Sequence, residues 1–138
     1  MRSEKLKIRL VKIDKKSMHE LSLLVEVVKI VEDLVVENKV QKLKAIVLQV
    51  GEVSTVIPSF MEEYFPVVTL DKPFFKDTKL EIEMIPGEAK CSDCGEVFNI
   101  VKTKGYCPKC NSFEKELLSG REFLIKELVV YDEGEQNE

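Results

Sequence analysis

The sequence predicts an α+β fold in which two helices pack on a small three-stranded mixed sheet, with a cysteine-rich module inserted before the last strand. Two segments carry apolar residues at helical spacing, and three carry them at strand spacing. All four cysteines fall within residues 91–110. Hydrophobic residues make up 44% and charged residues 33% of the 138-residue chain, which is typical of a globular protein.

A first helix is predicted from Met18 to about Asn38, because one face of this segment is apolar and the opposite face is charged. The apolar positions are Leu21, Leu24, Val28, Val31 and Val35, and the charged ones are Glu26, Lys29, Asp33 and Glu37. Ser17 and Glu20 have the spacing of a capping box, so Ser17 is the expected N-cap.

The other elements follow from short apolar patterns and from prolines. Residues 44–50, 79–85 and 122–131 are predicted strands. Pro58 suits the first turn of a second helix, and Pro66, which lacks a backbone N–H, is expected to end or kink that helix. The apolar residues of this helix are Phe60, Met61, Tyr64 and Phe65.

The predicted organisation divides the chain into four parts. They are a basic N-terminal extension (1–17), an α/β body (18–88 and 118–131), the cysteine module (89–117) and an acidic tail (132–138). Within the extension, residues 6–13 alternate between apolar and basic side chains and fit a short strand. The alternative is a leader outside the fold or a misplaced start codon.

Charge is distributed unevenly. Residues 1–17 hold seven basic and two acidic side chains, which leaves 14 basic and 23 acidic ones, a balance of −9, in the rest of the chain. Such a body repels phosphate backbones, so nucleic acid is not an expected partner. No apolar stretch reaches the roughly 18 residues of a membrane span, and no secretory signal pattern is present. We therefore expect a cytoplasmic protein that is not bound to a membrane.

Cys91, Cys94, Cys107 and Cys110 form two Cys-x-x-Cys pairs separated by twelve residues. In a reducing cytosol such a cluster indicates metal binding rather than disulfides. Four thiolates complete a closed tetrahedral site, so the prediction is structural Zn(II) without a catalytic role. Iron in a rubredoxin-like site is an alternative, because ligand number alone does not select the metal. A redox-active dithiol is less well supported.

The residues around the two pairs fit turns that present thiols to one ion. Gly95 and Asn111 each directly follow a pair, and both residue types tolerate the left-handed backbone expected there. The segment between the pairs is long enough for a hairpin, with Phe98 and Ile100 on one side.

His19 is the only histidine of the chain. By itself, a solitary histidine at a helix start is more often a solvated or capping residue than a ligand. A catalytic triad would have to use it, and the cysteines are already assigned to metal. No G-x-x-x-x-G-K phosphate loop is present. The residues therefore predict no enzyme.

Several motifs occur in a specific order. They are Met-His-Glu at residues 18–20, the amphipathic helix that follows, Gly-Glu-Val-Ser at residues 51–54 and the four-cysteine ribbon. In this order and spacing they resemble the HypA family of nickel metallochaperones for maturation of nickel–iron hydrogenase. The resemblance extends from Met18 to about Val130.

The resemblance implies an α/β nickel domain with a zinc ribbon, and Ni(II) as cargo. It implies that Met18, His19 and Glu20 hold nickel, His19 through its imidazole and backbone nitrogen and Glu20 through its backbone nitrogen, with its carboxylate near the ion. Nitrogen donors in tetragonal geometry suit Ni(II). The implied partners are a HypB-type GTPase and the hydrogenase large subunit, with urease accessory proteins in some relatives. A homodimer is left open.

One departure concerns the nickel motif. In the family the initiator methionine supplies its α-amine, whereas here Met18 follows seventeen residues and its nitrogen is an amide. Translation that starts at Met18, processing that exposes it, or weaker nickel binding would each account for this. Glu20 is also the capping-box partner of Ser17, which competes with nickel binding. Pro66 is a second departure, with local consequences only.

The alternative function is a zinc-ribbon interaction module that binds nucleic acid or transcription machinery. The charges of the ribbon are mixed and form no basic stripe, which opposes it; they are Asp93, Glu96, Lys102, Lys104 and Lys109. A redox or metal-dependent enzyme ranks lower, since four cysteines leave no open metal position.

Overall fold

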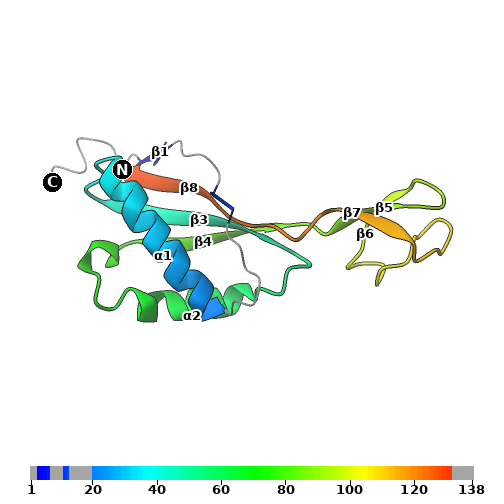
Figure 1. Ribbon diagram of the computed structural model, residues 1–138, viewed down its shortest axis with the longest axis horizontal. Helices are drawn as coiled ribbons and strands as arrows, with labels where there is room; N and C mark the ends of the chain where they lie inside the picture. Colours follow the sequence, from blue (N-terminus) through cyan, green and yellow to red (C-terminus); the bar gives the residue numbers. More distant parts are fainter. Residues whose placement is uncertain (1–2, 7–10, 13–19, 132–138) are drawn as a thin grey trace.

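The computed structural model describes residues 3–6, 11–12 and 20–131. They form an elongated molecule in which a narrow ribbon projects from one end of an α/β unit (Figure 1). In chain order the elements are β1 (Ser3–Leu6), β2 (Val11–Lys12), α1 (Glu20–Glu37), β3 (Leu43–Gly51), α2 (Pro58–Val68), the 3-10 turn η1 (Pro73–Phe75), β4 (Lys79–Ile85), β5 (Glu88–Cys91), β6 (Val97–Asn99), β7 (Lys115–Ser119) and β8 (Phe123–Tyr131).

The main sheet contains the predicted mixed core of three strands. Its order is β1-β8-β3-β4, and β2 also pairs with β8. β3 is parallel to β4 and antiparallel to β8. Parallel strands need a crossover, and α2 lies in the connection between β3 and β4. The three-stranded mixed sheet is confirmed, and the N-terminal extension adds strands to it.

The extension differs from its prediction. Instead of one strand over residues 6–13, two short strands, β1 and β2, pair antiparallel with β8. Leu6 lies opposite Leu128 and Val11 opposite Ile125, so the two strands pair with β8 in registers that differ by two residues. The described parts of the predicted strand therefore do not share one register, because alternation along one segment does not reveal a change of register against its partner. Residues 7–10 and 13 of that prediction lie outside the described residues.

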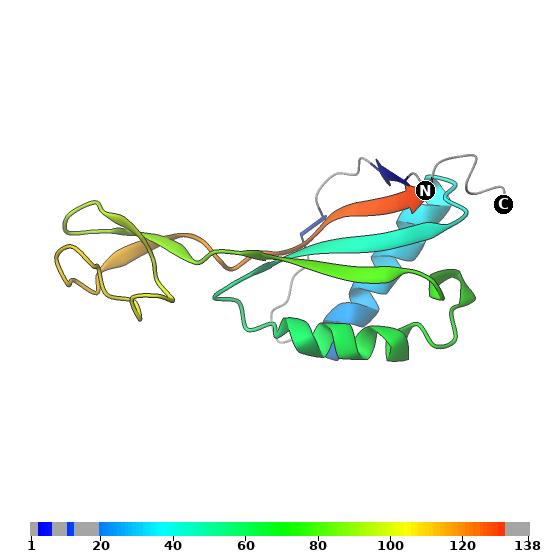
Figure 2. The same ribbon diagram turned by 180° about the vertical axis from the view of Figure 1, so that it is seen from behind.

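Both helices cover the same face of the sheet, and the view from behind shows the opposite face without a helix (Figure 2). The buried side chains of α1 are Leu23, Leu24, Val27, Val28, Val31 and Val35. Leu21, predicted to face the core, is 45% exposed because the buried stripe runs through Leu23 and Val27 instead. In the described part of the chain, no helix combines the length and apolar character of a membrane span.

The second helix, α2, begins at Pro58 as predicted. Of its four apolar residues named from the sequence, it buries Met61 and Phe65, while Phe60 and Tyr64 are 41% and 36% exposed. α2 continues through Pro66 and ends two residues later at Val68. The following residue closes the end: the Thr69 backbone N–H and hydroxyl both donate to the carbonyl of Phe65, at 3.1 and 2.8 Å.

The ribbon is an antiparallel sheet of order β6-β5-β7 with its own small core. That core contains Ala89, Cys91, Phe98 and Cys107, and it is separate from the core under the helices. β5 begins at Glu88 and β7 ends at Ser119, within two residues of the predicted module 89–117. The division of the chain into domains at these points stays a prediction.

Candidate metal centre

The first cysteine pair lies on a turn that two backbone hydrogen bonds hold in shape. Cys91 is the last residue of β5, and its N–H donates to the carbonyl of Glu96 at 2.8 Å. The Gly95 N–H donates back to the carbonyl of Cys91 at 2.9 Å. Gly95 has φ of 80°, as predicted for this position, because the chain must reverse immediately after Cys94.

The second pair repeats the same pattern. The Cys107 N–H donates to the carbonyl of Ser112 at 2.9 Å, and the Asn111 N–H donates to the carbonyl of Cys107 at 2.8 Å. Asn111 has φ of 64°, again as predicted. The Ser112 hydroxyl also donates to the carboxylate of Asp93, which joins the two turns. Two copies of one turn therefore face each other.

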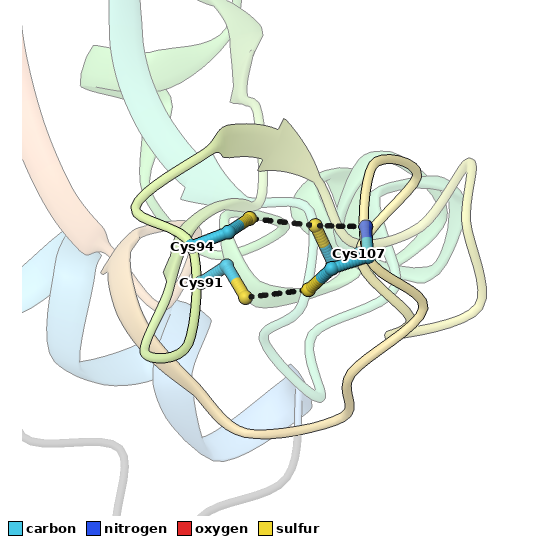
Figure 3. A group of neighbouring side chains, drawn as sticks. Cys91, Cys94 and Cys107 are labelled. Carbon is cyan, nitrogen blue, oxygen red and sulfur yellow. Dashed lines mark hydrogen bonds between the residues drawn. The ribbon is translucent and has the colours of Figure 1, made fainter.

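The two turns bring four sulfur atoms into one cluster (Figure 3). All four Sγ atoms lie within 4.8 Å of one another, and the Cys91–Cys110 and Cys94–Cys107 pairs are 3.5 Å apart. A tetrahedron with Zn–S bonds of about 2.3 Å has edges of roughly 3.8 Å. The cluster therefore has the donor set and the size of a closed four-thiolate site.

Backbone N–H groups favour the ionised form of the two buried thiols. The N–H groups of Lys109 and Cys110 point at the sulfur of Cys107, at 3.4 and 3.5 Å. Desolvation raises the pKa of Cys107, but these hydrogen bonds and the neighbouring thiols outweigh it and lower the pKa to about 7. The pKa of Cys91 is also lowered, chiefly by a hydrogen bond from the backbone of Cys94.

The two exposed thiols resist ionisation. The backbone of Ser112 lowers the pKa of Cys110, but the three neighbouring sulfurs and desolvation raise it to about 12. For Cys94, a hydrogen bond with the backbone of Glu96 lowers the pKa, while desolvation and the thiols of Cys107 and Cys91 produce a net rise. Four adjacent thiolates repel one another, so the fully ionised cluster requires a dication at its centre. Zn(II) fits this requirement.

The predicted nickel residues are placed only in part. Met18 and His19 lie outside the described residues, as does Ser17, the predicted N-cap. Glu20 is the first residue of α1 and is half-buried. α1 begins at the end of the α/β unit nearer to the ribbon (Figures 1 and 2).

One residue that joins the α/β unit to the ribbon, Glu52, has no role that the sequence predicted. The carboxylate of Glu52, directly after β3, accepts hydrogen bonds from the Gly87 N–H at 2.9 Å and the Asn99 side-chain amide at 3.2 Å. These two bonds lower the pKa of Glu52. Its position within the 51–54 motif was the only available signal, because its partners are distant in sequence.

Comparison with known sequences gives a consistent assignment. A family model described as "Hydrogenase/urease nickel incorporation, metallochaperone, hypA" matches residues 18–130. A hydrogenase maturation factor HypA from Albidiferax ferrireducens is 34% identical over 113 residues, which cover 82% of this chain and 99% of the relative. A HypA from Trichodesmium erythraeum is 36% identical, with 82% and 96% covered.

Solved structures agree with the sequence comparison. The solution structure of a nickel metallochaperone HypA from Helicobacter pylori has a TM-score of 0.58 and 27% identity, covering 84% of this chain and all of that one. A second HypA solution structure has a TM-score of 0.60 and 28% identity, with 83% and 97% covered. The match extends over both the helical unit and the four-cysteine ribbon, and this chain belongs to the HypA family.

Proposed function

We propose that this protein is a nickel metallochaperone that binds Ni(II) and delivers it for hydrogenase maturation. The observation that carries the proposal is the match to the metallochaperone family from residue 18 to residue 130. In this proposal the protein is a cytoplasmic carrier and not an enzyme, and nickel is its cargo. A carrier must release its ion, so nickel affinity has to be moderate.

In this proposal Zn(II) is held by Cys91, Cys94, Cys107 and Cys110 and has a structural role. Support comes from the sulfur cluster, from the matched turns around it and from the need of four thiolates for a cation. The metal closes the ribbon and holds its surface in shape. No position is left for a substrate, so zinc takes no part in chemistry.

In this proposal nickel binds separately from zinc, at Met18, His19 and Glu20. The His19 imidazole and the backbone nitrogens of His19 and Glu20 provide nitrogen donors for a planar site, with the Glu20 carboxylate near the ion. These donors bind nickel only when deprotonated. Acidification therefore releases the ion, and the imidazole is the group that protonates nearest to neutral pH.

The partners follow from a carrier role. A HypB-type GTPase acts with the protein during transfer, and the hydrogenase large subunit receives the ion. Urease accessory proteins are a second destination, consistent with the hydrogenase/urease description of the matching family. The nucleic-acid alternative loses its main argument, because the family match includes the ribbon as part of the nickel protein.

Nickel titration of the chain that begins at Met18 tests the proposal. We expect one Ni(II) per chain with the absorption band of a planar site, and we expect His19→Ala to abolish it while the zinc content is unchanged. His19 is the sole imidazole, so no other histidine can replace it. Asp33→Ala, on the exposed side of α1, is the matched control and should bind nickel normally. Equal nickel affinity in the His19→Ala variant would refute the site.

The N-terminal amine provides a second measurement. The chain from Met18 offers a free α-amine, whereas in the chain from Met1 the same nitrogen is an amide that must lose a proton to bind. We expect tighter nickel binding in the shorter chain. Equal affinities in the two forms would show that the amine takes no part.

A further inference from the structure

The outer edge of β8 is covered only by the N-terminal extension among the described strands. β8 pairs along its length with β3 on one side. On its other side β1 pairs with residues 128–131 and β2 with residues 124–125. The extension therefore occupies nearly the whole of this edge.

The family match and one nearly fully covered relative leave no counterpart of the extension that covers this edge. The family match begins at residue 18. The match to the relative from Albidiferax ferrireducens includes 99% of that protein but only 82% of this chain. An uncovered edge strand presents backbone N–H and C=O groups that pair readily with another chain. The edge of β8 is thus a strand-accepting surface that this protein covers with its own extension.

The sequence of β8 is complementary to itself in one antiparallel register. When two copies meet with the twofold axis between Lys126 and Glu127, each Lys126 lies opposite the Glu127 of the second copy. Opposite charges in such pairs stabilise, and like charges destabilise. The surrounding pairs are apolar: Ile125 with Leu128, Leu124 with Val129, and Phe123 with Val130.

This register also matches the faces of the sheet. The core residues of β8 are Phe123, Ile125, Leu128 and Val130, and in this register each lies opposite another core residue. A slip of one residue in either direction would place Glu127 opposite Glu127, or Lys126 opposite Lys126. It would also place core residues opposite residues of the other face. One register is therefore favoured over its neighbours.

We propose that the edge of β8 is a dimerisation surface whose occupant is a second copy of this chain, and that the N-terminal extension is a removable strand that blocks it. With residues 3–6 and 11–12 in place the protein is monomeric. Without them two β8 strands pair antiparallel about a twofold axis, which joins the two sheets into one. The inference is independent of nickel binding.

The first test compares the oligomeric state of the whole chain and of residues 18–138 by sedimentation at several concentrations. Residues 18–138 contain the entire family match, so this form retains the fold of its relatives. We expect the whole chain to sediment as a 15.8 kDa monomer and the shorter one to dimerise at least about tenfold more tightly. A peptide of residues 1–14 should return the shorter form to monomer.

Two pairs of variants separate this surface from other dimer contacts. In the whole chain, Glu4→Pro with Lys5→Pro removes two successive backbone donors, one of which faces β8, and should allow dimerisation; Glu4→Ala with Lys5→Ala should not. In residues 18–138, Lys126→Glu places like charges opposite each other and should weaken the dimer about tenfold. Adding Glu127→Lys restores the complementarity and should restore the dimer.

Lys126 already forms an ion pair within the chain, and the two charge variants affect it equally. Its ammonium lies 2.8 Å from the carboxylate of Glu83, and both charge variants lose this ion pair, so their comparison isolates the pairing between copies. A monomeric 18–138 chain would overturn the proposal. A dimer whose affinity is unchanged by the peptide and by the charge variants would also overturn it. So would equal dimer affinities of the whole chain and of residues 18–138.

Discussion

At the scale of single residues, one carboxylate links the two parts of the molecule. Glu52 leaves the end of β3 and binds the backbone of Gly87, in the connection to the ribbon, and the side chain of Asn99, inside the ribbon. Lys102 lies close enough to favour its charge as well. The ionised form of Glu52 therefore holds the ribbon against the α/β unit.

We predict that Glu52→Gln loosens this junction in a pH-dependent way. The pKa of Glu52 is depressed in the folded protein from an unperturbed 4.5, so its ionisation stabilises the fold above pH 4.5. That contribution is lost as the pH falls through the folded pKa. The protection of the Gly87 amide against hydrogen exchange should be lower in the variant at neutral pH, and the difference should vanish in acid.

Glu62→Gln, at an exposed position on α2, is the control for loss of a carboxylate and should leave Gly87 protection unchanged. A difference between Glu52→Gln and the unaltered protein that persists unchanged at acid pH would show that the charge of Glu52 is not the cause.

At the scale of elements, the turn after β3 packs against both connections to the ribbon. The Val53 N–H donates to the carbonyl of Gly120 at 2.9 Å, and the Glu52 N–H donates to that of Ile85 at 2.8 Å. Three chain segments approach so closely that a Cβ on Gly51 would lie 2.0 Å from the carbonyl oxygen of Gly120. Backbone cannot yield as a flexible side chain does, so only glycine fits here.

We predict that Gly51→Ala lowers the free energy of unfolding of the α/β unit by about 1–3 kcal/mol, the usual cost of forcing an extra carbon into a filled space. Thermal unfolding followed by the helical circular dichroism signal measures this. Gly95→Ala is the control, because its Cβ would meet no atom within 4 Å and only its left-handed backbone is strained. Its effect should be confined to the zinc turn. Equal helix stability in both variants would contradict the packing argument.

At the scale of the whole molecule, the two separate hydrophobic cores differ greatly in size. Among residues 20–131, the α/β core has eighteen buried residues, and the ribbon core has four, two of which are the thiols Cys91 and Cys107. A core this small cannot offset the loss of chain entropy on folding, so metal binding must stabilise the ribbon.

We predict that removal of zinc by a chelator unfolds residues 88–119 and leaves the helices folded. Amides of β5 and β7 should then exchange rapidly while those of α1 and β3 stay protected. Cys94→Ser should have the same effect without a chelator, since it removes one ligand. Ser92→Ala, between the two cysteines of the pair, should retain zinc. Full zinc retention by Cys94→Ser would show that the ligand set is different.

The sequence alone determined the features that depend on nearby residues. The C-terminal end of α1 and the start of α2 follow from local periodicity and from Pro58. The zinc turns follow from the spacing of each pair and from the residue after it, because the geometry of such a turn is fixed within about six residues. These predictions agreed with the structure because nothing distant could change them.

Tertiary structure decided what depends on partners far along the chain. Register against β8 divided the extension into β1 and β2, and the packing of α1 turned Leu21 toward solvent. The junction at Glu52 joins residues that are 35 and 47 positions apart. A local pattern shows that a strand can form or that a carboxylate is present. Only the folded chain determines which edge the strand joins and which donors reach the carboxylate.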